Sequence, residues 1–467
     1  MLDKLLIKNA QWIISLDDEG NRYQNADLLI EGNVIKAIGK NLEVEYDTQV
    51  IDATGKVVIP GMVNTHHHFY QTLTRAIPST QEIELFDWLT QLYEIWRELD
   101  EESVYFGSLV AMGELLKTGC TTSTDHHYVF PRGKSTELID VQIKAAKELG
   151  MRFHPTRGSM SLSKKDGGLP PDDVVQTEEE ILEDSERLIK LYHDPNPYAM
   201  CRIALAPCSP FSVTGRLMEE TVVLARKYGV ICHTHLAETK DEENFCLEKF
   251  GMRPFEYMKS LGWSGEDIWF AHSIHLTDDE IKEIGETRSG VAHCPVSNLK
   301  LSSGIARIKD LVDAGARVGL AVDGSASNDS SNMWAELKTA YLLQKYTLGQ
   351  KGLSAEETLR MACRGGAEVL GRTDIGYLAP GMAADMVLID FTDIAFAGAQ
   401  HDPVAAIVTC GDSQVVDTTI VNGKVVVRDG KLLAFNEDFI ATNANRVSAR
   451  MVAAAAKRTG IDYLKSN

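Results

Sequence analysis

The sequence predicts an α/β fold: a (β/α)8 TIM barrel that carries a small β-sandwich domain formed from both chain ends. Three observations predict it. Eight short apolar runs alternate with longer amphipathic stretches through the middle of the 467-residue chain, both ends contain short strands broken by turns, and polar residues follow most of the apolar runs. Eight βα units within roughly 300 residues have the size of such a barrel.

The two ends of the chain have the pattern of β structure. Near the N-terminus a Glu-Gly-Asn turn at 31–33 separates two apolar runs, and near the C-terminus Asn422-Gly423 is the pair that favours a two-residue hairpin. Each end has too few strands to form an independent sheet. We therefore expect residues 1–59 and 371–435 to pool their strands in one composite β domain, followed by a helical tail over 436–467.

The middle of the chain, residues 60–370, is expected to form the barrel. Its apolar runs do not alternate with polar residues, which is typical of strands that are buried on both faces of a parallel sheet. A doubly wound open sheet is the alternative, but no glycine-rich phosphate or dinucleotide motif follows the first run. The eight expected strands are Val57–Val63, Thr121–Asp125, Met151–Thr156, Cys201–Ala206, Val230–Thr234, Ile268–Ala271, Gly290–Ala292 and Arg317–Val322.

The composition restricts the class of partner. Acidic residues number 67 and basic residues 47, for a net charge of −20, which argues against nucleic acid or an anionic membrane as the partner. A nucleobase, which carries no phosphate, is not excluded. No apolar run approaches the roughly 18 residues of a membrane span. The 8 cysteines are scattered without a C-x-x-C pair, so we expect reduced thiols and a cytoplasmic location.

Histidines gather at the ends of the predicted strands. Ten of the 13 histidines lie in these clusters, and in a barrel all eight C-terminal strand ends meet at one mouth. His66 and His68 are two residues apart, so on a strand they point to the same side while His67 points away. With His235 after the fifth run and Asp323 after the eighth, they offer three imidazoles and one carboxylate, which is the ligand set of a hydrolytic zinc or iron site.

One metal ion is expected rather than two. The stretch Cys201–Cys208 around the fourth run contains no Lys, Glu or Asp that could bridge a second ion. We expect one divalent ion per subunit, zinc in the first place with iron as the alternative, because three imidazoles and a carboxylate accommodate both. Without a thiolate ligand, such an ion keeps enough Lewis acidity to bring the pKa of a water towards 7.

Further residues are candidates for contact with a substrate. Gln71 follows the H-x-H pair by three positions and offers a donor and an acceptor to the edge of a ring. Arg157, after the third run, is placed to bind a carbonyl group of a purine. Trp88 and Trp96 lie in the long first loop, where they either stack on a flat ring or pack within their own helix. Two more candidates, chosen by their position at the mouth alone, are His127 and Cys208.

Longer stretches resemble the amidohydrolase superfamily, and within it the mononuclear deaminase and chlorohydrolase branch. The resemblance covers nearly the whole chain. It implies the same four metal ligands, with Asp323 also acting as a base, and adds Glu238 as the proton shuttle and His272 as a contact of the attacking water or the tetrahedral intermediate. It also implies a homo-oligomer. The stretches that carry the resemblance are NTHHHFYQTLTRA (64–76), DHHYVFP (125–131), TRGSMSL (156–162), GGLPP (167–171), APCSPFSVT (206–214), HTHLAET (233–239), HCPVSN (293–298) and VDGSASND (322–329).

The same resemblance implies a reaction. We expect a hydrolase that acts on C–N bonds in cyclic amidines and removes the amino group of a nucleobase, so that 8-oxoguanine would give urate and ammonia. Isocytosine, a pterin, a triazine, and S-adenosylhomocysteine or methylthioadenosine are the alternative substrates. Two other classes stay open: a hydrolase of a C–Cl bond or a cyclic amide, and a binding protein that kept the barrel and lost catalysis. An intact ligand set with Glu238 argues against the binding protein.

Overall fold

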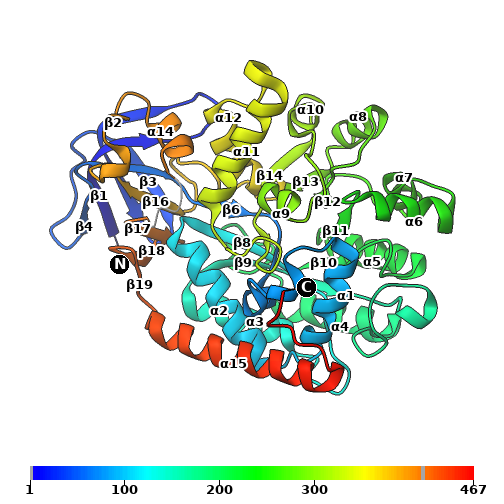
Figure 1. Cartoon of the computed structure of the whole chain (residues 1–467). Helices are drawn as coiled ribbons and strands as arrows, with labels where there is room; N and C mark the ends of the chain where they lie inside the picture. The colour runs from blue at the N-terminus through cyan, green and yellow to red at the C-terminus, as the bar shows by residue number, and fades with distance from the viewer. Residues whose placement is uncertain (1–3, 412–415, 467) are drawn as a thin grey trace.

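The computed structural model describes residues 4–411 and 416–466, and it contains two parts (Figure 1). Eight parallel strands form a barrel surrounded by helices, and a second sheet that contains strands from both ends of the chain lies beside it. The predicted fold class is confirmed. The barrel matters most for function, because its strands bring residues from distant parts of the sequence to one mouth.

The barrel strands follow one another in chain order, from β6 to β14. The barrel closes where the backbone N–H and the hydroxyl of Thr65 both donate to the carbonyl oxygen of Leu320, at 3.2 and 3.1 Å. Next to this seam, the short strands β7 (His67–His68) and β15 (Asp323–Gly324) pair in parallel. The barrel strands are β6 (Met62–Asn64), β8 (Cys120–His127), β9 (Arg152–Ser159), β10 (Ala204–Pro207), β11 (Cys232–Leu236), β12 (Ile268–His272), β13 (Gly290–His293) and β14 (Arg317–Leu320).

Helices connect the barrel strands and cover their outer face. In α5 the hydroxyl of Thr214 accepts a hydrogen bond from the backbone of Leu217, and Gly229 ends the helix in the left-handed conformation. The last helix, α15, lies along α2 on the outside of the barrel (Figure 1). The helices are α1 (Leu85–Trp96), α2 (Glu101–Lys117), α3 (Leu138–Leu149), α4 (Glu178–Tyr192), α5 (Gly215–Tyr228), α6 (Lys240–Phe250), α7 (Pro254–Ser260), α8 (Asp278–Glu286), α9 (Pro295–Lys300), α10 (Ile308–Asp313), α11 (Met333–Leu348), α12 (Ala355–Arg360), α13 (Gly366–Val369), α14 (Pro403–Thr409) and α15 (Glu437–Thr459).

The second sheet joins the two ends of the chain through one antiparallel pair, β5 with β16. This sheet encloses an apolar cluster. The turn between β2 and β3 contacts the turn between β17 and β18. A Cβ at Gly423 would lie 2.1 Å from the carbonyl oxygen of Gly32, so only glycine fits there. The strands are β1 (Lys4–Ile14), β2 (Arg22–Glu31), β3 (Val34–Gly39), β4 (Gln49–Asp52), β5 (Lys56–Pro60), β16 (Met386–Asp390), β17 (Thr418–Val421), β18 (Lys424–Arg428) and β19 (Lys431–Leu432).

One expected barrel strand is divided between the two sheets. The run Val57–Val63 is divided at Gly61: its first part is β5 of the second sheet, and only β6 belongs to the barrel. The reason is a close approach at the junction, since a Cβ on Gly61 would lie 2.0 Å from the hydroxyl oxygen of Thr121. A continuous apolar run therefore serves two sheets, which hydrophobicity alone does not reveal.

Two features bear on the environment of the protein. Within residues 4–411 and 416–466, no helix combines the length and the apolar character that a membrane span requires. All eight cysteines have free thiols.

Candidate active site

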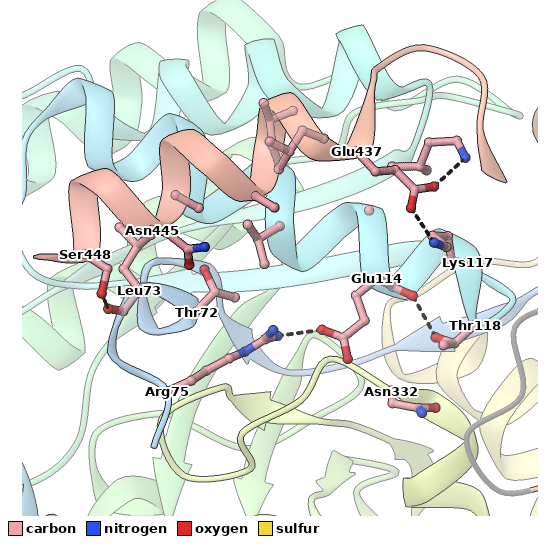
Figure 2. Close-up of a pocket in the computed structure, with 17 residues that line it drawn as sticks. Thr72, Leu73, Arg75, Glu114, Lys117, Thr118, Asn332, Glu437, Asn445 and Ser448 are labelled. Atoms are coloured by element: carbon pink, nitrogen blue, oxygen red, sulfur yellow. Dashed lines mark hydrogen bonds and ion pairs between the residues drawn. The ribbon is translucent and has the colours of Figure 1, made fainter. Parts of the chain in front are cut away.

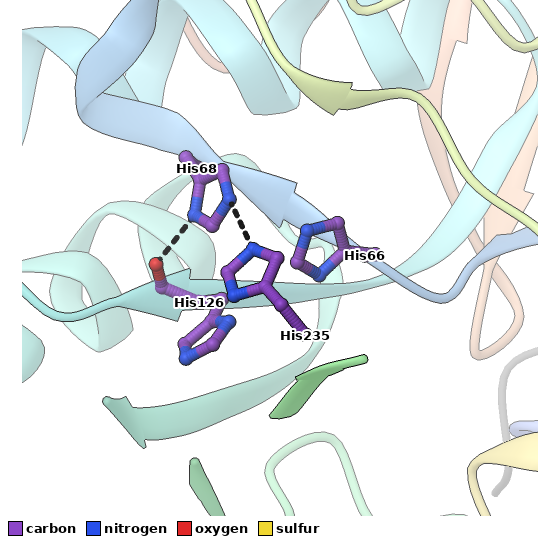
Figure 3. Close-up of side chains that lie close together, drawn as sticks. All are labelled: His66, His68, His126 and His235. Carbon is purple, nitrogen blue, oxygen red and sulfur yellow. Dashed lines mark hydrogen bonds between the residues drawn. The ribbon is translucent and has the colours of Figure 1, made fainter. Parts of the chain in front are cut away.

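Three histidine rings and one aspartate converge at the mouth of the barrel. Nε2 of His68 lies 3.2 Å from Nε2 of His235 (Figure 3), and Oδ1 of Asp323 lies 3.2 Å from Nε2 of His66 and 3.3 Å from Nε2 of His68. Nε2 of His66 is buried and makes no hydrogen bond. Buried imidazole nitrogens need a partner, and these donor atoms are those that a divalent ion prefers. Ligand atoms of His66, His68, His126 and His235 lie close together (Figure 3), as do those of His66, His272 and Asp323, so the residues present fit a metal ion.

The outer nitrogens of two of these rings are held by backbone carbonyl groups. Nδ1 of His68 lies 2.7 Å from the carbonyl oxygen of His126, and Nδ1 of His235 lies 2.7 Å from that of Cys208. A carbonyl oxygen only accepts, so Nδ1 carries the proton in both rings and Nε2 keeps its lone pair. The Nε2 lone pairs of His68 and His235 therefore face the cluster of histidine and aspartate side chains.

Asp323 is held as a carboxylate. Its Oδ2 accepts hydrogen bonds from the hydroxyls of Ser297, at 2.5 Å, and Ser327, at 3.2 Å. Both hydroxyl donors favour the charged form of this carboxyl. Asp323 also adopts the left-handed backbone conformation, with φ of 61°, a strained conformation that is frequent at functional sites.

Glu238 and His272 form a second group beside the ligand cluster. Oε2 of Glu238 lies 3.6 Å from Nε2 of His272, and Nδ1 of His272 contacts Oδ1 of Asn298 at 2.8 Å. Burial raises the pKa of Glu238 above its ordinary value. Burial lowers the pKa of His272, but the negative charges of Glu238 and Asp323 outweigh burial, so that this pKa is raised. A buried carboxyl with a raised pKa is suited to carry a proton at neutral pH.

Glu242 supports Glu238 and was not expected to do so. The sequence places it in an acidic run that is typical of a solvated helix start, yet its side chain is fully buried. Its two carboxylate oxygens accept hydrogen bonds from the backbone N–H groups of Ala237 and Glu238, each at 2.9 Å. Its place at the third position of α6 is the signal that could have found it, because an acidic residue there often folds back onto the preceding loop.

A cavity opens onto this group of side chains. Its wall combines the polar side chains of the site with apolar ones, and it includes three of the expected substrate contacts, Gln71, Trp88 and Cys208. Burial raises the pKa of the Cys208 thiol to about 12, so this cysteine is a neutral wall residue at pH 7. The free space is about 30 Å³, roughly that of one water molecule. A flat heterocycle can enter only if the wall moves; its apolar members are Leu85, Trp88, Leu89, Tyr93, Phe211 and Leu301.

Three of the expected substrate contacts do not line this cavity. The indole N–H of Trp96 donates to the hydroxyl of Thr74 at 3.1 Å, and the ring is buried in the packing of its own helix. Of the two tryptophans of α1, it is Trp88 that lines the cavity.

The other two residues are Arg157 on β9 and His127 on β8, and their side chains contact other protein side chains. Arg157 lies inside β9 and not after it: Nε donates to Asp184 at 2.6 Å and Nη2 donates to Gln176 at 2.8 Å. This guanidinium is already paired with protein groups and does not line the cavity. His127 packs edge-on against Tyr70, and burial lowers its pKa to about 3.

A larger cavity of about 670 Å³ lies on the outside of the barrel, between α2 and α15 (Figure 2). Its charged residues are paired: Arg75 with Glu114 and Lys117 with Glu437, each at 2.6 Å. It contains no histidine or cysteine. Size alone therefore does not identify the functional site. The cavity at the mouth of the barrel is the one that is lined by side chains able to bind a metal ion and transfer protons.

Known proteins are similar to this chain in sequence and in fold. The model of the amidohydrolase family matches residues 57–426. The 8-oxoguanine deaminase of Pseudomonas aeruginosa is 48% identical over 401 residues, which are 86% of this chain and 89% of that protein. The hydroxydechloroatrazine ethylaminohydrolase of a Pseudomonas species is 36% identical over 96% of this chain and 97% of that protein.

Solved structures agree with these matches. The crystal structure of atrazine chlorohydrolase from Arthrobacter aurescens complexed with zinc superposes with a TM-score of 0.91 at 33% identity, covering 95% of this chain and all of that one (100%). An adenosine deaminase of Xanthomonas campestris with bound zinc superposes with a TM-score of 0.87 at 25% identity, covering 96% of this chain and 98% of that one. The chain thus belongs to the amidohydrolase family, with hydrolytic deaminases and a chlorohydrolase among its relatives.

Proposed function

We propose that this protein is a metal-dependent hydrolytic deaminase of an amino-substituted nucleobase, which converts 8-oxoguanine to urate and ammonia. One observation carries the proposal: the carboxyl of Glu238 lies beside His272 at the mouth where three histidines and Asp323 converge. The 48% identity with an 8-oxoguanine deaminase supports the choice of substrate. The reaction is a step of purine metabolism.

The proposed cofactor is one divalent ion per subunit, zinc in the first place and iron as the alternative. His66, His68, His235 and Asp323 would hold it, and no thiolate is among them. When bound, such an ion lowers the pKa of a water molecule and polarises the carbon–nitrogen bond that is attacked. The zinc found in two similar structures supports this assignment.

The residues of the chain supply the proton transfers. Asp323, which is held as a carboxylate, takes the proton of the attacking water. Glu238, whose pKa is raised by burial, donates a proton to the ring nitrogen next to the reacting carbon. It then receives the water proton back from Asp323 and passes it to the departing amine. As the C–N bond breaks and the C=O bond forms, the hydroxyl proton of the tetrahedral carbon returns to Glu238, so both carboxyl groups end as they began. His272 faces the same centre and stabilises the tetrahedral carbon through Nε2. Ammonia then leaves as a neutral molecule.

The cavity wall favours a flat, uncharged ring. Gln71 offers an amide to the ring edge, and Trp88 offers an aromatic face. No lysine or arginine lines the cavity, so a substrate with a phosphate or carboxylate would lose a charged group's hydration without compensation. This argues for a free base over S-adenosylhomocysteine, which carries a carboxylate. Trp96, Arg157 and His127 do not line this cavity.

A panel of ammonia-release assays tests the proposal. The zinc-loaded protein is assayed with 8-oxoguanine, guanine, isocytosine, cytosine, isoxanthopterin, adenine nucleosides and aminotriazines, and with a chlorotriazine for chloride release. The expected result is a kcat/KM for 8-oxoguanine at least about tenfold above every other compound. Strong release from isocytosine with none from 8-oxoguanine would overturn the substrate. Less than about 0.1 equivalent of metal would instead favour a binding protein that has lost catalysis.

We also infer that the protein is a homo-oligomer in the cytoplasm that binds neither nucleic acid nor membrane. The eight free thiols favour a reducing compartment, and the net charge of −20 disfavours polyanionic partners. Light scattering on the purified protein measures the mass of the assembly. A particle of 51.6 kDa, the mass of one chain, would contradict the oligomer.

A further inference from the structure

The outer nitrogen of His66 is held differently from those of the other two inward histidines. His68 and His235 each have a backbone carbonyl at Nδ1. Nδ1 of His66 instead lies 2.7 Å from Nε2 of His233, a second imidazole. An imidazole nitrogen can either donate or accept, so this contact alone does not determine which nitrogen of His66 carries the proton.

The carbonyl of Trp269 resolves this ambiguity. Nδ1 of His233 lies 3.0 Å from the carbonyl oxygen of Trp269, which can only accept a hydrogen bond. His233 therefore carries its proton on Nδ1, and its Nε2 has a lone pair that accepts. His66 must then donate from Nδ1 to His233. The proton of His66 is thus on the outer nitrogen, and the lone pair of Nε2 faces the ligand cluster.

Packing fixes the position of His233 as well as its proton. The ring of His233 stacks on the indole of Trp269, with centroids 4.3 Å apart and planes 14° from parallel. The indole N–H of Trp269 in turn donates to the carbonyl oxygen of Thr65, at 3.1 Å, directly before His66. The side chains of His66, His233 and Trp269 are all buried. Trp269 therefore holds His66 from both sides, through the preceding peptide and through the His233 ring.

We infer that His233 is a positioning residue for the metal centre: it fixes the Nδ1–H tautomer of His66 and thereby presents the Nε2 lone pair of His66 to the ion. His233 and His235 lie two residues apart on β11 and point to the same side. One of them is a ligand and the other orients a ligand from a different strand. The inference rests on the metal centre of the proposed function and not on the identity of the substrate.

Three variants of His233 separate the hydrogen bond from the space that the ring fills. The amide of His233→Gln reaches the place of Nε2 and can accept from His66. The amide of His233→Asn reaches only the place of Nδ1, so it can donate to Trp269 but leaves His66 without an acceptor. His233→Leu makes neither contact. The dissociation constant for zinc is measured by competition with a chelator, and the absorption spectrum of the cobalt-substituted protein reports the ligand geometry.

The expected result is zinc binding that is about 10–100-fold weaker in His233→Asn and His233→Leu. In His233→Gln the dissociation constant stays within a few-fold of the unmodified protein, and the cobalt spectrum is retained. His154→Asn is the matched control, because His154 is a buried barrel histidine that contacts Arg372 and no expected ligand. Its zinc affinity is expected to stay unchanged. Melting temperatures measured without metal show that each variant folds.

Two results would overturn the inference. Zinc binding by His233→Asn as tight as that of the unmodified protein would show that the acceptor is not needed. Equal losses in His233→Gln and His233→Leu would show that the ring only fills space. If the unmodified protein binds no zinc, the inference and the proposed metal centre fail together. If zinc binds as expected but none of the heterocycles is deaminated, only the proposed substrate fails and the role of His233 stands.

Discussion

Asp125 is a buried carboxyl that supports the metal-binding segment from behind. Its Oδ1 accepts from the backbone N–H of Phe69 at 2.5 Å, directly after His68, and its Oδ2 accepts from the amide of Gln142 at 2.6 Å. Burial raises its pKa from 3.8 to about 7, although the hydrogen bond from Phe69 opposes the rise. Between about pH 4 and pH 7, the folded protein therefore keeps a proton on Asp125 that the unfolded chain has already released.

This difference predicts how stability depends on pH. The contribution of Asp125 to the free energy of unfolding is fully present below pH 4 and is lost as the pH rises through about 7. The side chain of Asp125→Asn does not titrate. Its amide N–H group can donate to Oε1 of Gln142 if the Gln142 amide rotates, because this oxygen has no hydrogen-bond partner in the unmodified protein. From pH 5 to 7 the unmodified protein should lose up to about 1.4 kcal/mol per pH unit relative to the variant. Melting temperatures at a fixed zinc concentration measure this difference; a difference that does not change with pH would contradict the pKa.

The pairing of β7 with β15 places Gln71 as well as the ligands. Gly324 lies in β15, and a Cβ at this position would lie 1.9 Å from Oε1 of Gln71. The same oxygen accepts from the backbone N–H of Ala326 at 3.3 Å. Glycine at 324 thus allows the Gln71 amide to lie at the edge of the cavity.

Gly324→Ala is predicted to move Gln71 without disturbing the metal ligands. We expect kcat/KM to fall about tenfold, the equivalent of one hydrogen bond of about 1.4 kcal/mol, with zinc content unchanged. Gln71→Ala should have a similar effect, and the double variant should be no worse than either one. Gly39→Ala is the control, since its Cβ would meet Leu42 at 3.5 Å in ordinary contact. Additive losses in the double variant would show that Gly324 does not act through Gln71.

The sequence predicted the elements of the site better than the direction of individual side chains. The two-residue spacing of His66 and His68 placed both on one side of the chain, because alternation along an extended strand is independent of the rest of the fold. Arg157 was misplaced because β9 runs to Ser159, three residues beyond the predicted end. Its side chain therefore contacts Asp184 of α4 and does not project from the strand end into the mouth.

Other errors came from packing between elements. Trp88 and Trp96 lie on the same helix, and only the position of α1 against the barrel decides that Trp88 lines the cavity. The strand boundary at Gly61 depends on the distance to Thr121 on a neighbouring strand. His233 was not recognised because its role requires the carbonyl of Trp269 and the ring of His66, which only the closed barrel brings together.

At the scale of the molecule, one buried ion pair joins the barrel to the second sheet. Arg152 of β9 donates to both carboxylate oxygens of Asp385, at 2.8 and 2.9 Å, and the side chains are 0% and 2% exposed. The same arginine donates to the side chain of Asn422, in the turn before β18, at 3.1 Å. The second sheet is thereby held against the barrel by a buried charge pair.

Breaking this pair from one side is predicted to destabilise the whole protein. Arg152→Met leaves the Asp385 carboxylate buried without its charged partner, with the backbone N–H of Asn422 as its remaining donor, which costs about 3–5 kcal/mol. Arg152→Met combined with Asp385→Leu removes both charges and should recover most of that loss. Denaturant unfolding of the three proteins measures the difference. A single variant within about 1 kcal/mol of the unmodified protein would show that the interface does not depend on the pair.

In the proposed reaction, the carboxyl of Glu238 beside a single metal site moves the protons of a hydrolytic deamination. Glu238→Gln tests it most directly, with turnover of 8-oxoguanine and zinc content measured on the same preparation. We expect kcat to fall by about 10²–10⁴-fold while zinc stays at one equivalent per chain, because Glu238 is not one of the expected ligands. A variant that keeps its zinc and also keeps near-normal kcat would show that Glu238 does not transfer these protons.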